Sequence, residues 1–265
     1  MKELRVQIAR AATGDQEAVH ATRIAIRRWF STVKAFEDYF NDAPESQLHR
    51  VLKNVMDASS SVRDCDVAAE LLARLEAGPE ILSKVARRRA KRARRLSKVL
   101  QEAAAGEFAS SGNPGAAAKP GANPGGEPLV HHAQEVLKSA FKDFLKRGER
   151  EVHERDSRRL HKFRIQAKEL RYTLELFSSA GTGFDEWREP VRKLQSLLGD
   201  AHDCDAIREM VANWPENKAV NARLKRRREA KLRQFRSLWR ERFSRASLPA
   251  PKPPMRQSLQ HRQTA

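Results

Sequence analysis

The sequence contains few of the residues that covalent bridging or membrane insertion would require. Its 265 residues include two cysteines, Cys65 and Cys204, which are too few for a disulfide framework and favour a reducing compartment. Residues 1–15 lack the apolar run of a signal peptide, and no window approaches the roughly 18 apolar residues of a transmembrane helix. We therefore expect a soluble, cytoplasmic protein that does not span a membrane.

Signals for strands and for catalysis are missing as well. Alternating runs of Val, Ile and Thr are absent, which excludes a protein built on sheets. There is no glycine-rich phosphate loop, no Gly-x-Ser-x-Gly motif, no zinc-ligand spacing and no carboxylate cluster to hold the metal ions of phosphoryl transfer. Aromatic residues make up only 6% of the chain and do not alternate with basic residues, as a base-stacking surface requires. We expect neither catalysis nor a cofactor.

Negative charge is scarce relative to positive charge. Lys and Arg number 52 against 34 Asp and Glu, which gives a formal net charge of +18. Because hydrophobic residues still make up 40% of the chain, the basic residues belong to a folded protein. A protein this basic repels itself, and an anionic partner relieves the repulsion. The candidate polyanions are nucleic acid, an anionic membrane surface and inorganic polyphosphate.

The apolar residues recur with helical period along nearly the whole chain, so the predicted fold class is all-α. Prolines followed or preceded by an acid mark helix starts at Pro44, Pro79, Pro190 and Pro215. The predicted helices cover residues 2–12, 16–41, 45–60, 62–77, 79–104, 130–147, 157–180, 186–199, 201–213 and 215–245. An Ala/Gly/Pro-rich stretch over 103–128 predicts a flexible linker, and residues 247–265 predict a disordered basic tail.

One basic motif occurs twice. The sequence His20-x2-Arg23-x3-Arg27 returns 141 positions later as His161-x2-Arg164-x3-Lys168. Helical spacing places the basic residues of each copy on one face and apolar residues on the other. We call these faces the first row, which extends to Lys34, and the second row. A solvated charged face is the commonest meaning of such a pattern, but its recurrence and its histidines favour a site for phosphate oxygens.

Two further blocks repeat in the same order. Arg63-Asp64-Cys65-Asp66 matches His202-Asp203-Cys204-Asp205, and Arg87–Arg89 matches Arg226–Arg228, both at an offset of 139. The repeats predict an internal duplication. The predicted fold is two pseudo-symmetric four-helix bundles, residues 1–102 and 129–246, related by a pseudo-two-fold axis. The two rows then form a basic central groove for an extended polyanion.

Two basic runs follow the repeated Asp-Cys-Asp triplets. Residues Lys84 to Lys98 include nine basic residues in fifteen, and Arg223 to Arg233 include seven in eleven. Apolar positions within both runs predict packed helices rather than disorder. We expect these helices to line the same basic surface as the rows, through residues such as Arg88, Arg95 and Arg227.

The Asp-Cys-Asp triplets have two chemical interpretations. Asp and Cys can bind metal ions, but consecutive positions on a helix point in different directions and cannot converge on one ion. We expect the aspartates instead to cap a helix or to hold the cationic rows in place through ion pairs. The two cysteines occupy equivalent positions, where we expect small core residues near the pseudo-two-fold axis.

The repeated motifs resemble a known family. The stretches VHATRIAIRRW, SSVRDCDV, RLHKFRIQAKELRYTLEL and LQSLLGDAHDCDA are similar to the CHAD family of conserved-histidine α-helical domains, over residues 5 to 245. The resemblance implies two four-helix bundles around a basic groove, binding of inorganic polyphosphate, association with polyphosphate granules, and no catalysis by the domain. The binding residues that it implies are His20, Arg23, Arg27, His161, Arg164, Lys168 and Arg171. Phe30 stands where the second row has Arg171, which weakens the first row.

Three functions follow from these features. Binding of inorganic polyphosphate rests on the two rows and on the resemblance. Binding of nucleic acid, in the manner of a nucleoid protein, rests on net charge alone. A polyphosphate-processing enzyme would need an acidic metal-binding cluster, and the sequence offers no candidate for one.

Overall fold

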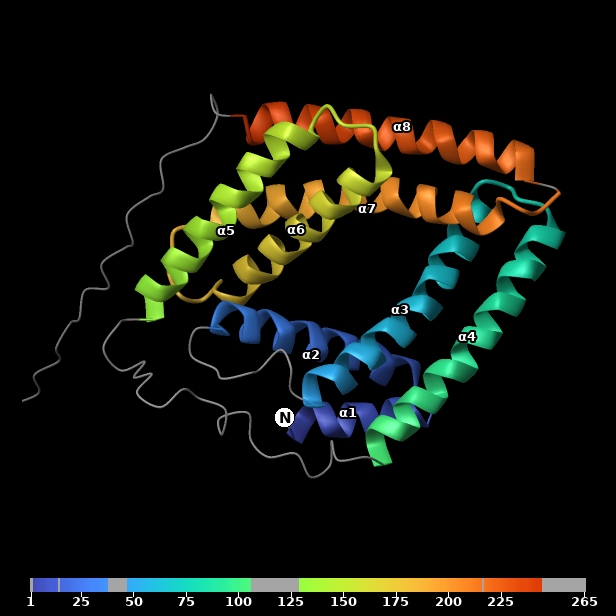
Figure 1. The fold of residues 1–265 in the computed structure, drawn as a ribbon, viewed down its shortest axis with the longest axis horizontal. Helices are drawn as coiled ribbons and strands as arrows, with labels where there is room; N and C mark the ends of the chain where they lie inside the picture. The colour runs from blue at the N-terminus through green and yellow to red at the C-terminus, as the bar shows by residue number, and fades with distance from the viewer. Residues whose placement is uncertain (1, 14, 38–46, 106–128, 216, 245–265) are drawn as a thin grey trace, which may run out of the picture. The chain divides into compact units, whose positions relative to one another are not determined.

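A computed structural model describes residues 2–13, 15–37, 47–105, 129–215 and 217–244. All regular structure in these ranges is helical, which confirms the predicted fold class. The helices (Figure 1) are α1 (Lys2–Ala12), α2 (Gln16–Ala35), α3 (Gln47–Arg74), α4 (Pro79–Ala105), α5 (Leu129–Glu151), α6 (Ser157–Leu176), the short 3-10 helix η5 (Asp185–Trp187), α7 (Arg188–Val211) and α8 (Asn217–Arg242).

Two predicted helix boundaries are wrong. The predicted helices 45–60 and 62–77 are one helix over the described residues, α3 (Gln47–Arg74), because its central serines do not interrupt it; residues 75–77 lie beyond its end, and residues 45 and 46 lie outside the described residues. The Ser59 hydroxyl donates to the carbonyl oxygen of Met56 at 3.0 Å, so that the helix satisfies this polar group itself. The predicted helices 186–199 and 201–213 are likewise joined in the single helix α7 (Arg188–Val211), which begins after η5 and ends two residues before the predicted end. The glycine between them, Gly199, costs a helix only about 1 kcal/mol relative to alanine.

The linker prediction is corrected at one end. Residues 103–105 form the last turn of α4, where Ala103 is buried. The rest of the predicted linker, the predicted tail, Pro44 and residues 38–41 of the second predicted helix lie outside the described residues. The other predicted helices are confirmed, with α4 beginning at Pro79 as its proline predicts.

The chain divides into two compact units. The first combines residues 1–123 with 197–233, and the second combines residues 124–196 with 234–265. The boundaries fall inside α7 and α8, so each of these helices contributes to both units. The division into bundles at residues 1–102 and 129–246 stays a prediction.

The first unit has a core formed by its first four helices. Helices α3 and α4 lie side by side as a hairpin, and α1 packs against α2 and α4 (Figure 1). Their apolar faces meet in one buried cluster, which includes Ile8, Ile26, Leu52, Val55 and Leu100. Burial of these faces stabilises the helices and leaves the basic residues on their outer sides.

A second buried cluster of the first unit brings together residues that are 139 positions apart in the sequence. It joins the ends of α3 and α4 to the parts of α7 and α8 that belong to this unit. The matched positions are Cys65 and Cys204, Ala68 and Ile207, Leu72 and Val211, Ile81 and Val220, and Val85 and Leu224. Both cysteines are fully buried and free, which confirms them as core residues.

Contacts at the edge of this cluster are reciprocal. The Arg223 guanidinium on α8 donates to the carbonyl oxygen of Leu75, beyond the end of α3. At the two equivalent positions, Lys84 on α4 lies over the ring of Trp214, beyond the end of α7, at 5.7 Å from its centroid. Reciprocal contacts of this kind are typical of a two-fold interface. They favour the predicted duplication.

The second unit has an aromatic core. The Phe144 ring on α5 stacks on Phe163 of α6 at a centroid distance of 5.2 Å, and Trp239 of α8 packs against both. Gly148 allows this packing, because a Cβ atom at its position would overlap the Trp239 ring. This core fixes the buried side of α6, opposite the second row.

Candidate anion-binding site

The first row lies on α2, whose start the sequence specifies. Asp15 caps the helix by accepting a hydrogen bond from the Ala18 backbone N–H at 3.0 Å. This bond and the Arg10 guanidinium at 2.7 Å hold the pKa of Asp15 below its ordinary value. Ala18 is buried on the opposite side of the helix, whereas His20 is exposed and Arg23 is half-buried, facing α3.

Neighbouring side chains fix the position of Arg23. Its Nη1 donates to the hydroxyl oxygens of Ser59 at 2.7 Å and Ser60 at 3.2 Å, both on α3. The next residue of the row, Arg27, donates from Nε to the Arg23 carbonyl oxygen at 3.2 Å. These hydrogen bonds set the geometry of the Arg23 guanidinium before an anion arrives.

These residues surround a cavity of about 510 Å³ between helices of the first unit, which we call the α2–α4 cavity. Its polar lining includes four basic residues: His20, Arg23, Arg63 and Arg89. The one carboxylate among its lining residues, Asp66, pairs with Arg89 at 2.5 Å. The remaining positive charge makes the cavity attractive to an anion.

The second row lies on α6 in the second unit. Asp156 caps this helix through the Arg158 backbone N–H at 2.9 Å, at the position that matches Asp15. The residues His161, Arg164, Lys168 and Arg171 are all half-buried. Their apolar counterparts Phe163, Leu170, Leu174 and Phe177 are buried, as predicted.

Tyr172 adds an aromatic face to the second row. The Arg171 guanidinium lies 4.7 Å from the centroid of its ring, and the Lys168 ammonium lies 5.9 Å from it. Arg171 also pairs with Glu175 at 3.6 Å. These contacts orient the two cations without neutralising the row.

His161 is set to be neutral before an anion binds. Burial lowers its pKa below the ordinary histidine value, and the adjacent charge of Arg164 lowers it further. An anion in contact with the imidazole favours its protonated form and raises this pKa. The protonation of His161 is therefore coupled to the binding of an anion.

The aspartates of the two triplets form matching ion pairs. Asp66 on α3 accepts from Arg89 Nε on α4 at 2.5 Å, and Asp205 on α7 accepts from Arg228 Nε on α8 at 2.7 Å. Asp66 and Asp205 thus form ion pairs as predicted, but with arginines of α4 and α8, which lie outside the two rows. Among the described residues, no group of three or more His, Cys, Asp and Glu side chains could hold a metal ion.

A second pair of matching contacts lies farther along the same helices. Arg92 donates to the Ser61 carbonyl oxygen at 2.8 Å, while at the equivalent positions Lys231 pairs with Asp200 at 2.7 Å. The contact geometry repeats, but an aspartate replaces a serine in the second copy. The hairpin of α3 and α4 therefore has fewer carboxylates beside its cations than the pair α7 and α8.

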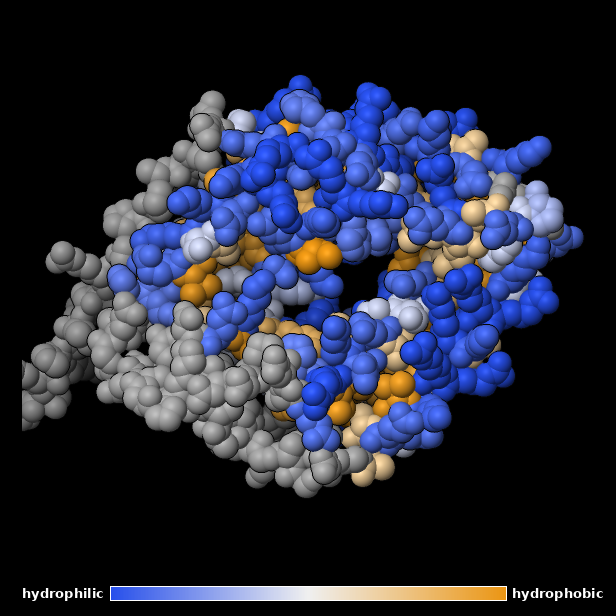
Figure 2. Space-filling view, viewed as in Figure 1, coloured by the Kyte–Doolittle hydropathy of each residue, from blue (hydrophilic) through white to orange (hydrophobic). Residues whose placement is uncertain are grey.

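The other predicted residues lie in several surroundings. Lys34 and Arg88 are exposed, and hydrophilic residues cover most of the face in Figure 2, including the outer side of α4. Arg227 is half-buried near Cys204. Burial of the Cys204 thiol raises its pKa to about 11, and the positive charge of Arg227 acts in the opposite direction. The Nε atom of Arg227 is buried without a hydrogen-bond partner among the described residues.

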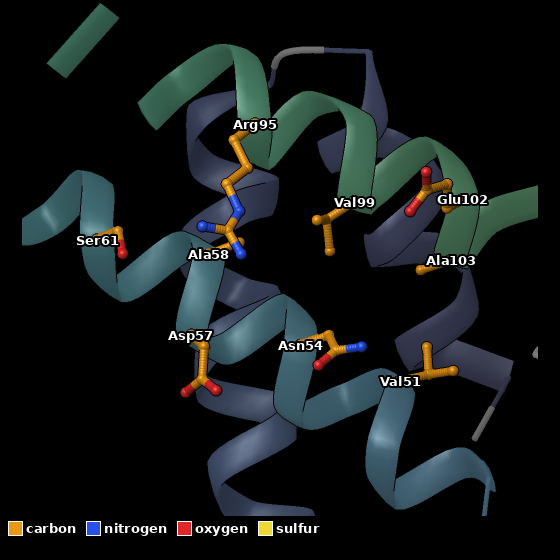
Figure 3. A pocket seen from close by; sticks show the side chains of 9 residues that line it. All are labelled: Val51, Asn54, Asp57, Ala58, Ser61, Arg95, Val99, Glu102 and Ala103. Atoms are coloured by element: carbon orange, nitrogen blue, oxygen red, sulfur yellow. The ribbon is translucent and has the colours of Figure 1, made fainter. Parts of the chain in front are cut away.

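Arg95 lines a different cavity from His20 and Arg23. This cavity, of about 420 Å³, lies between α3 and α4, and Asp57 and Glu102 also line it. In Figure 3 the Arg95 side chain extends toward Ala58, and the Asp57 carboxylate points away from it. Two carboxylates make this surrounding less favourable for an anion than the α2–α4 cavity.

The structure therefore brings His20 and Arg23 together, and adds Arg63 and Arg89 to them. Neither of these arginines was among the predicted binding residues, although both belong to repeated sequence blocks. Ser59 and Ser60 were missed because a serine in a helix carries no signal of its own. None of the described helices has the length and hydrophobicity that a bilayer crossing requires.

Comparisons with known proteins agree with this architecture. The family model described as CHAD domain matches residues 1–212. The crystal structure of the CHAD domain from the plant Ricinus communis superposes with a TM-score of 0.57 at 20% sequence identity, covering 95% of this chain and 88% of that one. That likeness shows the fold. No curated protein sequence matches.

The matching ion pairs should differ in their effect on stability, because they differ in burial. The side chains of Arg228 and Asp205 are 12% and 15% exposed, whereas those of Arg89 and Asp66 are 41% and 33% exposed. We expect Asp205→Asn to lower the free energy of unfolding by about 2 kcal/mol, and Asp66→Asn by less than about 1 kcal/mol. Urea denaturation measures both. Equal losses would mean that burial does not set the strength of these pairs.

Proposed function

The chain belongs to the CHAD domain family, and we propose that it binds inorganic polyphosphate through its two basic rows. The observation that carries the proposal is the α2–α4 cavity, where His20, Arg23 and Arg63 gather beside only one carboxylate. Guanidinium groups pair with phosphate oxygens through two parallel hydrogen bonds, and a chain of phosphates offers such oxygens at every unit.

The proposed binding residues come from both rows and from the basic helices. They are His20, Arg23, Arg27, Lys34, Arg63, Arg88, Arg89, Arg95, His161, Arg164, Lys168, Arg171 and Arg227. The proposed role is binding without catalysis, in two duplicated bundles that present a common basic groove. Through this binding the protein associates with polyphosphate granules in the cytoplasm.

Competition with duplex DNA tests the proposal. We expect labelled long-chain polyphosphate to bind the full-length protein at physiological salt, and excess duplex DNA to displace it poorly. The affinity should fall steeply with salt, because the bound phosphates release their counterions. Displacement by an equal concentration of DNA phosphate would instead make the protein a general binder of polyanions or of nucleic acid.

Charge reversal tests whether the rows have a special role. We expect Arg23→Glu combined with Arg164→Glu to weaken polyphosphate binding by about 100-fold, since each change removes a fixed guanidinium and adds a repulsive charge. The control is Lys142→Glu combined with Lys146→Glu, which changes the net charge equally at exposed positions of α5. The control should lose less than about fivefold in fluorescence titration. Similar losses in both variants would show that bulk charge drives binding.

The pH dependence of affinity tests the coupling at His161. Because the anion raises the lowered pKa of His161, binding takes up a proton, and the affinity should rise as the pH falls. The rise begins above the ordinary histidine pKa and levels off below the lowered pKa of the free protein. We expect an increase of about threefold to tenfold between pH 8 and pH 5.5 for long chains, whose few terminal phosphates contribute little titration of their own.

Two variants test whether His161 causes this pH dependence. His161→Gln should flatten the profile, while His153→Gln, at an exposed position on the same unit, should leave it unchanged. Calorimetry in buffers of different ionisation enthalpy measures the proton uptake directly. Equal proton uptake by the wild type and by His161→Gln would exclude His161 as the coupled group.

A further inference from the structure

The α2–α4 cavity has a surface that a polyphosphate chain cannot use. Besides its basic residues, its lining includes six apolar side chains: Ala11, Val19, Val62, Ala93, Leu96 and Leu100. Inorganic polyphosphate has no apolar part to place against them. An apolar lining with a few polar groups, in a volume between about 300 and 1,000 Å³, is typical of sites for small organic molecules.

The matching positions of the second half have larger side chains. Leu160 occupies the position that matches Val19, and the other matches are Leu232 with Ala93, Phe235 with Leu96 and Trp239 with Leu100. All four of these larger side chains are buried. The same framework of helices therefore accommodates side chains that fill this space, and the first half has smaller residues at each position.

The neighbour of Arg23 on α2 follows the same trend. Thr22 stands where the second half has Phe163, the centre of the aromatic core. Its hydroxyl is buried, and no hydrogen bond joins it to another described residue. An aromatic ring in place of this threonine would add packing contacts, and unfilled interior volume costs stability. The cavity is therefore not a requirement of the fold.

We propose that the α2–α4 cavity binds a small organic phosphate, with its phosphate group on His20, Arg23 and Arg63 and its apolar body against Val19, Ala93 and Leu96. Arg63 and His20 have no ion pair with any described residue, which leaves both available to the phosphate. The ligand class is a phosphate monoester with an aromatic or aliphatic body that fits within about 510 Å³. This ligand would compete with a polyphosphate chain for Arg23, and so would regulate its binding.

Two probes of similar charge test the role of the apolar lining. We would titrate the full-length protein with 1-naphthyl phosphate and, separately, with inorganic phosphate, by calorimetry at pH 7.5. We expect naphthyl phosphate to bind at least about tenfold more tightly, since burial of its rings adds to the same phosphate contacts. Equal affinities would overturn the proposal, whether or not the protein binds polyphosphate.

A substitution that fills the cavity tests whether the small phosphate binds there. Ala93→Leu introduces the residue that the second half has at this position, and should weaken naphthyl phosphate at least about tenfold while changing polyphosphate affinity less than about twofold. The control is Ala90→Leu, at an exposed position of α4 outside the cavity lining, which should change neither. Unchanged naphthyl phosphate binding in Ala93→Leu would place the ligand elsewhere and overturn the proposal.

A second variant distinguishes loss of the binding site from a folding defect. Val19→Leu also copies the second half and fills the cavity from α2, so it should weaken naphthyl phosphate as Ala93→Leu does. Circular dichroism and thermal melting identify a variant that has lost its helices. Loss of both ligands in a folded variant would overturn the assignment of the apolar lining to the small ligand alone, whereas retention of naphthyl phosphate in both folded variants would overturn the site itself.

Discussion

The ion pairs between the third and fourth helices of each repeat are the constraint on which the arrangement of basic residues depends. Helix α4 has no acidic residue between Lys84 and Lys98; its own Glu102 pairs with Lys98, whereas the carboxylate that pairs with Arg89 comes from α3. Asp66 supplies one to Arg89, and Asp205 does the same for Arg228. Asp205 also pairs with Arg208 of its own helix. The pairs between helices help to fix the packing of α3 with α4 and of α7 with α8. The fold and the attraction for anions therefore depend on the same small number of carboxylates.

The two halves of the sequence that the motifs align differ in their ion pairs and in the size of their buried side chains. Around Asp205 the cations are closely matched, since Lys231 pairs with Asp200 where the first repeat has Arg92 on a backbone carbonyl oxygen. The buried side chains also differ in size. They are large and aromatic in the second half of the sequence, and smaller beside Arg23 in the first half. The α2–α4 cavity and the basic residues that line it thus lie beside the smaller side chains of the first half. The proposed site for a small ligand rests on this combination.

Much of this organisation could be predicted from local sequence patterns. The caps Asp15 and Asp156, and the buried faces of α2 and α6, follow from residues within a few turns of one another. The boundary inside α3 was predicted wrongly, because serine favours helix ends in general while Ser59 satisfies its hydroxyl within the helix and receives Arg23 from another one. The α2–α4 cavity could not be predicted, since its lining comes from four helices and its volume depends on their packing. Arg63 and Arg89 belong to repeated blocks, but only the packing of the helices places them beside His20.

The burial of both cysteines gives the protein a natural reporter of its own motions. Cys65 and Cys204 belong to one cluster that joins the α3–α4 hairpin to α7 and α8, and neither thiol is accessible. The high pKa of Cys204 further suppresses its thiolate in the closed protein. A thiol reagent can therefore react only when the cluster opens. The rate of labelling would measure how often the two hairpins separate, and its change with a bound polyanion would show whether the ligand strengthens the junction between them.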